Sequence, residues 1–141
     1  KQNPLFVFDR ELATKLPLKI LLAEDNLTNQ KVVAKILKNL GYQVDIVSNG
    51  LEVLEAVEQQ IYDVILMDIQ MPEMDGLDAT KALLKLNLEP HPYVIALTAN
   101  AMQHDRLACL EVGMDDYITK PVRLDLLVQA LWRSQCCRLV F

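Results

Sequence analysis

Apolar runs of strand length alternate along this chain with segments of helical period. The five runs are nearly continuous rather than alternating apolar and polar, which is typical of strands buried on both faces of a parallel sheet. They are LKILLA (18–23), QVDIVS (43–48), DVILMD (63–68), YVIALT (93–98) and DDYIT (115–119). The pattern therefore predicts five strands.

Each run is followed by a segment whose apolar residues recur at helical spacing. In the first of these segments the stripe extends from Val32 to Leu40, and Gly41 is placed to end the helix. Four more helices are predicted, one after SNG (48–50) and three at about 77–86, 102–112 and 124–132. Strand and helix alternate five times, which favours an α/β domain with helices on both faces of a parallel sheet.

Length and charge limit the class of protein. The 141 residues, 52% of them hydrophobic and 23% charged, suit one globular domain, which we place at residues 18–133. Residues 1–17 are then a linker or N-terminal extension, and 134–141 a C-terminal tail too short to be an output domain. A net charge of −5 argues against nucleic-acid binding, and no apolar run approaches the ~20 residues of a membrane span. We expect a cytoplasmic domain without direct membrane contact, either alone or within a membrane-anchored protein.

Polar side chains gather where the predicted strands end. Glu24 and Asp25 follow the first strand, Asp68 ends the third, Thr98 ends the fourth, and Lys120 follows the fifth. In an open parallel sheet, ligands bind outside the carboxyl ends of the strands. An isolated aspartate is more often a helix cap or a solvated loop residue, but five functional groups at one edge favour a site.

The chemistry of these groups indicates phosphoryl transfer. Three carboxylates close together repel one another and need a cation, and hard oxygen ligands suit Mg²⁺ or Mn²⁺ rather than zinc. The cation and Lys120 would bind phosphoryl oxygens, Thr98 would donate a hydrogen bond, and Asp68 would attack. No glycine-rich nucleotide loop is present, so the phosphoryl group must arrive on a protein or a small donor.

The chain resembles the receiver domain of two-component response regulators over roughly residues 18–132. The positions that match are the acidic pair Glu24 and Asp25, the phosphoacceptor Asp68, Thr98, and Lys120 with its following proline. The resemblance implies a flavodoxin-like, doubly wound sheet in the strand order 2-1-3-4-5 with five helices. The segments most like receivers of hybrid sensor histidine kinases are AEDNLTNQKV, MDIQMPEMDG, ALTANAM and GMDDYITKP.

The resemblance also implies a role for each matching residue. Asp25, Asp68 and the backbone carbonyl of Gln70 would bind Mg²⁺, with Glu24 acting directly or through water. Lys120 would pair with the phosphate, and in receivers the peptide bond between this lysine and the next proline is commonly cis. Such a domain catalyses only its own phosphorylation and dephosphorylation.

Signalling positions follow from the same resemblance. Thr98 and Tyr117 correspond to the family's switch pair, while Gln70 and Asn100 flank the path of the water that hydrolyses the phosphate. The implied partners are a sensor histidine kinase as donor and a histidine phosphotransfer protein as acceptor, which would dock around Leu27 to Lys31 and the loop at Pro121.

Three other functions compete with a relay receiver. A haloacid-dehalogenase-type phosphatase would need a second aspartate two residues after Asp68, where this chain has Gln70. A receiver-like binding module that never takes phosphate would usually have lost part of the acidic pair, the acceptor or the lysine. A stand-alone single-domain response regulator, acting by phosphorylation-dependent protein binding, has the same site residues and stays open.

Overall fold

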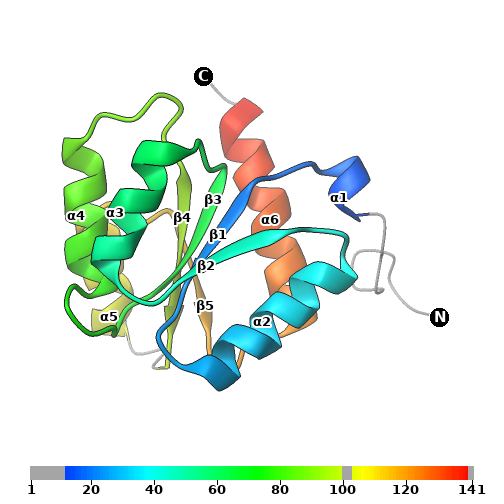
Figure 1. Cartoon of the computed structure of the whole chain (residues 1–141), viewed down its shortest axis with the longest axis horizontal. Coiled ribbons are helices and arrows are strands. Elements are labelled where there is room, and N and C mark those ends of the chain that lie inside the picture. The colour runs from blue at the N-terminus through cyan, green and yellow to red at the C-terminus, as the bar shows by residue number, and fades with distance from the viewer. Residues whose placement is uncertain (1–11, 100–102, 140–141) are drawn as a thin grey trace.

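The computed structural model describes residues 12–99 and 103–139, which form a five-stranded parallel sheet. The strand order is β2-β1-β3-β4-β5, as Figure 1 shows. This result confirms the flavodoxin-like order and the doubly wound architecture. The strands are β1 (Ile20–Ala23), β2 (Val44–Val47), β3 (Val64–Asp68), β4 (Tyr93–Thr98) and β5 (Asp116–Thr119).

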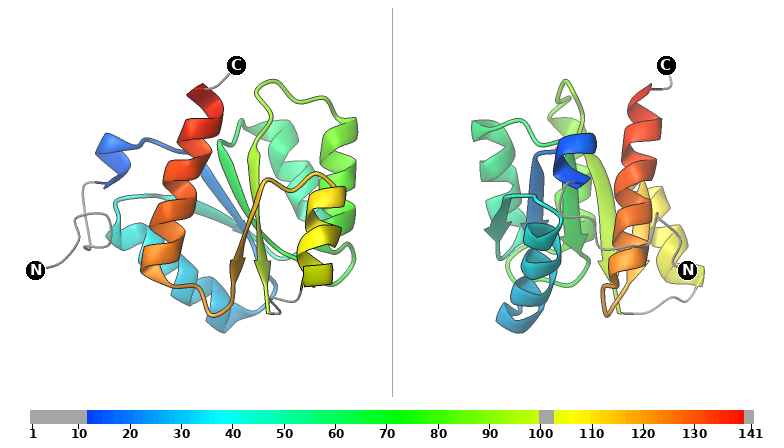
Figure 2. Two further views of the ribbon diagram at one scale, coloured as in Figure 1. Left: turned by 180° about the vertical axis from the view of Figure 1, so that it is seen from behind. Right: turned by 90° about the vertical axis from the view of Figure 1, so that its right-hand side faces the viewer.

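Two layers of helices enclose the sheet. Helices α3, α4 and α5 cover one face, and α2 and α6 cover the other (Figures 1 and 2). Among the described residues, no helix is both long enough and apolar enough to span a bilayer. The helices are α1 (Leu12–Lys15), α2 (Leu27–Asn39), α3 (Gly50–Gln59), α4 (Gly76–Lys85), α5 (Gln103–Glu111) and α6 (Leu124–Leu139).

The helix count corrects the sequence prediction. The pattern predicts five helices and the described residues form six, because α1 lies in the segment expected to be a linker or extension. A single turn has too few positions to show a helical period. The last helix also runs past its expected end near residue 132. There the Arg133 guanidinium pairs with Asp116 of β5 at 2.7 Å, and Ser134 is fully buried.

Burial follows the strand order. Every residue of the three inner strands is buried, whereas the edge strands β2 and β5 are largely half-buried. One apolar layer joins the sheet to α1, α2 and α6, and the other joins it to α3, α4 and α5. Burying one aliphatic side chain fully contributes about 1.5–3 kcal/mol to the stability of the fold. The three inner strands therefore hold the residues at their carboxyl ends in fixed positions.

Three of the helices begin with a capping side chain at the edge of the sheet where the strands end. The N-caps of α2, α3 and α4 are Asn26, Asn49 and Asp75, and each side chain accepts the backbone N–H three residues later at 2.9–3.0 Å. Gly41, with a φ of 98°, follows the end of α2 as expected. These caps set where each loop at this edge stops.

Helix α1 is integrated into the core. Leu12 and Leu16 are 3% and 1% exposed, and the Tyr42 hydroxyl donates to the Leu16 carbonyl at 2.6 Å. The Ala13 N–H donates to the carbonyl of Leu40, just beyond α2, at 3.1 Å. This helix lies at the end of the sheet where the strands begin (Figure 1). The described part of the N-terminal segment is therefore part of the folded domain.

Truncating Leu16 should destabilise the whole domain. We expect Leu16→Ala to lower the free energy of unfolding by about 2–5 kcal/mol, because it leaves a cavity in a closed apolar layer. Leu110→Ala is the matched control, since that side chain is 59% exposed on α5, and its effect should stay within about 0.5 kcal/mol. Urea denaturation followed by circular dichroism measures both. Equal, small effects would show that Leu16, directly after α1, is not part of the cooperative unit.

Candidate functional site

The first pair of acids is held by the end of β1 and the start of α2. The Glu24 N–H donates to the carbonyl of Val47 on β2 at 3.0 Å, and the Asn26 N–H donates to Glu24 Oε2 at 3.1 Å. Gln30, one turn into α2, donates its side-chain amide to the Glu24 carbonyl. Glu24 is therefore fixed in place, while Asp25 next to it remains exposed.

The other groups come from the ends of three adjacent strands. Asp68 and Thr98 are the last residues of β3 and β4, and Lys120 directly follows β5. The Lys120 N–H donates to the Thr98 carbonyl at 2.7 Å, so the lysine continues the sheet for one more residue. The Lys120–Pro121 peptide bond is cis, as the resemblance implied.

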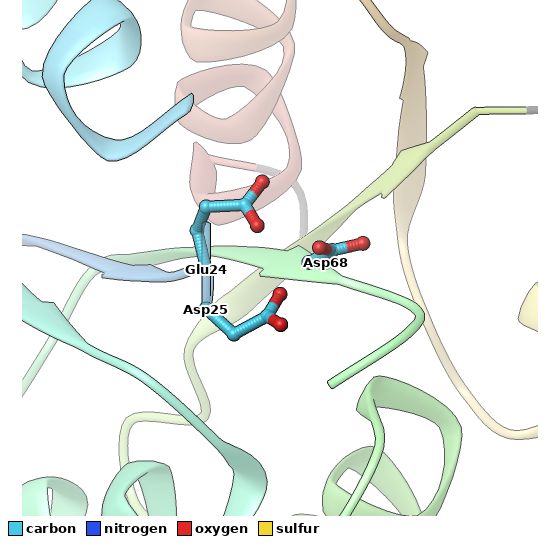
Figure 3. Close-up of side chains that lie close together, drawn as sticks. All are labelled: Glu24, Asp25 and Asp68. Carbon is cyan, nitrogen blue, oxygen red and sulfur yellow. The ribbon is translucent and has the colours of Figure 1, made fainter. Parts of the chain in front are cut away.

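Three carboxylates meet in this arrangement, as Figure 3 shows. One oxygen from each of Glu24, Asp25 and Asp68 lies within 4.8 Å of the others. Glu24 and Asp68 are buried, with 1% and 5% exposure. The Lys120 ammonium lies 2.9 Å from Glu24 Oε1 and 2.9 Å from Asp68 Oδ2. One positive charge thus faces three negative ones.

Burial and crowding change the ionisation of the buried groups. Burial, followed by the Glu24 carboxylate, raises the pKa of Asp68 to about 6 against the opposing effect of Lys120. Burial also opposes ionisation of Glu24, but Asp68, Lys120 and the Asn26 N–H together lower its pKa. Burial disfavours the charged form of Lys120, yet the two carboxylates outweigh it and raise the pKa of the ammonium. When a proton enters this group, it therefore resides on Asp68.

The donor set fits a divalent cation. Glu24 Oε1 is buried, and the Lys120 ammonium 2.9 Å away is its ion-pair partner. One ammonium among three carboxylates leaves the cluster short of positive charge, which a divalent cation would supply. The available ligands are all oxygens, which Mg²⁺ and Mn²⁺ prefer and zinc does not.

An open cleft of about 720 Å³ gives access to these groups. Gln70 lies on its wall, and its backbone N–H donates to Asp68 Oδ1 at 3.2 Å. Met71 and Asn29 also line the cleft. Asn100, predicted to influence phosphate lifetime, lies outside the described residues.

A glycine lets the loop after Asp68 fold back against the strand. A side chain at Gly76 would place its Cβ 2.3 Å from the Asp68 carbonyl oxygen, so no other residue fits without displacing the backbone. The Gly76 N–H donates to the Ile69 carbonyl at 2.8 Å and closes the loop at its base. The loop from Ile69 to Gly76 is thus tied directly to Asp68.

Tyr117 lies on β5 and is not among the described residues that line the cleft. It pairs in register with Ala96, and Thr98 lies two residues further along β4. Because side chains alternate along a strand, Thr98 and Tyr117 face the same side of the sheet. The Arg106 guanidinium of α5 lies 4.7 Å from the centre of the half-buried Tyr117 ring.

Several residues of the site were not predicted. Asn26, Asn29 and Gln30 share one side of the first turn of α2, and their spacing after the acidic pair is a helix-start signal that could have identified them. Arg106 carries no such local signal, since its contact joins a helix to a strand. The five groups predicted at the strand ends are brought together by the fold.

Comparison with known proteins matches this geometry. Residues 20–132 match the family model of the response regulator receiver domain. Hybrid signal transduction histidine kinase B of Dictyostelium discoideum is 46% identical over 125 residues, covering 80% of this chain and 6% of that protein. Histidine protein kinase 1 of Candida albicans is 47% identical over 124 residues, covering 81% and 5% respectively. The chain thus spans a small fraction of the length of these relatives.

Solved structures give the same result. The receiver domain of a Pseudomonas aeruginosa sensor histidine kinase, with magnesium coordinated in its active-site cleft, has a TM-score of 0.76 at 43% identity, covering 82% of this chain and 95% of that one. A co-crystal of the Saccharomyces cerevisiae histidine phosphotransfer protein Ypd1 with the receiver domain of the response regulator Ssk1 has a TM-score of 0.81 at 26% identity, covering 88% and 92%.

The raised pKa of Asp68 predicts pH-dependent cation binding. Without metal the carboxyl holds a proton below pH about 6, and a cation must displace it. We expect Mg²⁺ affinity to be nearly constant from pH 8 to 7, then to fall by up to about tenfold per pH unit below 6. Isothermal titration calorimetry measures this, with Asp78→Asn, an exposed acid of α4, as the control. An affinity unchanged between pH 7 and 5 would remove Asp68 from the ligand set.

Proposed function

This chain belongs to the response regulator receiver domain family, and we propose that it accepts a phosphoryl group from a histidine kinase on Asp68 and passes it to a histidine phosphotransfer protein. The observation that carries the proposal is the contact of the Lys120 ammonium with both Asp68 and Glu24 at 2.9 Å, on the wall of an open cleft. Asp68 is buried beside one lysine and further acids. Because these carboxylates already repel one another, Asp68 gains more negative charge only when a cation binds with it.

Mg²⁺ is the cation we propose, with Mn²⁺ as an alternative of the same ligand preference. Asp25, Asp68 and the backbone carbonyl of Gln70 would hold it, with Glu24 acting directly or through water. The magnesium in the related Pseudomonas aeruginosa receiver supports the assignment, as do the oxygens of Glu24, Asp25 and Asp68, which lie within 4.8 Å of one another. When bound, the ion would neutralise charge on the carboxylates and on the phosphoryl oxygens.

The transfer itself needs little covalent chemistry from the protein. A carboxylate oxygen of Asp68 forms a bond to phosphorus as the phosphorus–nitrogen bond of the donor's phosphohistidine breaks, and the imidazole leaves with the electron pair. The Lys120 ammonium and the Thr98 hydroxyl stabilise the phosphoryl oxygens. Gln70 and Asn100 then influence how long the acyl phosphate survives, and since neither side chain is a general base, hydrolysis is slow enough for onward transfer.

The surface beside the cleft suits a protein partner. Leu27 and Val32 of α2 are 69% and 45% exposed, and a small apolar hollow of about 80 Å³ lies between α2 and Pro121. We propose that the phosphotransfer protein docks over residues 27–31 and Pro121. The yeast co-crystal joins a receiver and a phosphotransfer protein, and two Dictyostelium discoideum relatives are hybrid signal transduction histidine kinases, which favours a relay over a stand-alone regulator.

Asp68 should be the only stable phosphate acceptor. With acetyl phosphate and Mg²⁺ we expect the wild type to gain the mass of one phosphoryl group in intact-protein mass spectrometry, and Asp68→Asn to gain none. Asp78→Asn, which removes an exposed acid outside the described lining of the cleft, should behave like the wild type. Phosphate on the Asp68→Asn variant at the wild-type level would place the acceptor elsewhere.

Phosphorylation should be reported through Thr98 and Tyr117. A phosphoryl group offers the hydroxyl a charged acceptor, and movement of Thr98 on the shared face of the sheet frees space for the Tyr117 ring to turn inward, away from Arg106. Such a coupling is about 1–3 kcal/mol. With beryllofluoride and Mg²⁺, we expect Thr98→Ala to bind the analogue but lose the NMR shift changes around Tyr117.

Thr98→Ser is the matched control for this experiment, because it keeps the hydroxyl and should keep most of the response. Full-size changes around Tyr117 in Thr98→Ala would show that the hydroxyl is not the link.

A further inference from the structure

We infer that Gly50, the first residue of α3, is a positioning residue for the loop that joins Asp68 to α4. This inference rests on the proposed function, because the loop carries the Gln70 carbonyl assigned to the cation. Gly50 itself is outside the described lining of the cleft. Its effect on the site would be exerted through Met74, at the far side of the loop.

The contact between α3 and the loop is one of backbone on backbone. The Gly50 N–H donates to the Met74 carbonyl at 2.8 Å. A Cβ added at Gly50 would lie 2.7 Å from that carbonyl oxygen, 2.7 Å from Met74 Cγ and 3.0 Å from the Cβ of Ala79. The methionine side chain is able to rotate away, but the carbonyl moves only if the loop moves. Only glycine allows both the hydrogen bond and the close approach.

The α3 side of this contact is rigid. Asn49 caps the helix by accepting the Glu52 N–H at 2.9 Å, and Glu52 returns to accept the Ser48 N–H at 2.7 Å. The two bonds tie the N-cap Asn49 and the residue before it, Ser48, to Glu52 in the first turn of the helix. The Gly50 N–H is therefore directed at the loop by a fixed helix end. Added volume at Gly50 would be accommodated by the loop rather than by the helix.

The loop between Asp68 and α4 is also conformationally constrained. Its base is closed by the bond from the Gly76 N–H to the Ile69 carbonyl at 2.8 Å, and its tip is a tight turn in which the Met74 N–H donates to the Pro72 carbonyl at 2.7 Å. Glu73 within this turn has a left-handed φ of 67°. A shift at Met74 therefore propagates along a short, constrained segment toward Gln70, whose N–H contacts Asp68.

The inference predicts that Gly50→Ala weakens cation binding without altering any ligand. We expect Mg²⁺ affinity to fall about tenfold, as is typical for loss of an outer contact that orients a ligand. Calorimetric titration of Mg²⁺ into the full chain measures the affinity, at a temperature where circular dichroism shows the variant folded. Wild-type affinity in the folded variant would overturn the inference.

Two further variants separate positioning from general instability. Gly113→Ala is strained at a φ of +100° and would meet Leu84 Cδ1 at 2.6 Å, so it should lower stability while leaving Mg²⁺ affinity unchanged. Gly50→Ala with Met74→Ala should remain weak, because the Met74 carbonyl is still in the way. Recovery in the double variant, or an equal loss in Gly113→Ala, would contradict a backbone contact that positions the loop.

A measurement on the wild type covers the case in which Gly50→Ala does not fold. The first amides of a helix normally exchange rapidly because they lack partners within the helix. We expect the Gly50 amide to be protected in the metal-free protein, and Mg²⁺ to slow its exchange further. Rapid exchange in both states would overturn the inference. A protected Gly50 amide in a protein that neither binds Mg²⁺ nor takes phosphate would instead reject the proposed function and leave the contact standing.

Discussion

A single lysine ammonium facing two buried carboxylates is the interaction on which the rest of the site depends. Lys120 lies 2.9 Å from both Glu24 and Asp68, with Asp25 alongside. One positive charge does not balance three negative ones, and burial makes the imbalance costly. The site therefore takes up a proton on Asp68 or binds a cation. A bound metal cation, in addition to the Lys120 ammonium, would allow Asp68 to carry the added negative charge of a phosphoryl group.

The sheet, together with the glycines that begin α3 and α4, keeps these charged groups close to one another against their repulsion. Asp68 and Thr98 end inner strands whose residues are all buried, so the positions of both side chains follow from the packing of the two apolar layers. The loop after Asp68 is held at two places where backbone meets backbone, at Gly76 beside the strand and at Gly50 at the start of α3. The charged groups are carried by rigid strands, and glycine takes the place of a larger residue where the loop closely approaches the strand or α3.

The two ends of the sheet serve different purposes. The end where the strands finish carries the charged cleft and the exposed apolar residues of α2, which together suit contact with another protein. At the end where they begin, α1 lies beside the start of β1, and Leu12 of this helix and the following Leu16 are buried in the core.

The sequence by itself determined the strands, the principal helices and the polar groups that stand at the strand ends. Continuous apolar runs and helical stripes are local patterns, and the β4 run was predicted to the residue at 93–98. The acids, the threonine and the lysine stand directly at strand ends, so a parallel sheet necessarily brings them to one edge. The strand order came from the family resemblance, since neither period nor spacing distinguishes an inner strand from its neighbours.

Only the tertiary structure decided the features that depend on contacts between distant segments. These are the docking of α1 on Tyr42, the continuation of α6 through the pairing of Arg133 with Asp116, the approach of Gly50 to Met74, and the raised pKa of Asp68. A one-turn helix has no period, and a glycine does not reveal in sequence which backbone it touches. Ionisation likewise depends on burial and on neighbouring charges, and both exist only after the chain has folded.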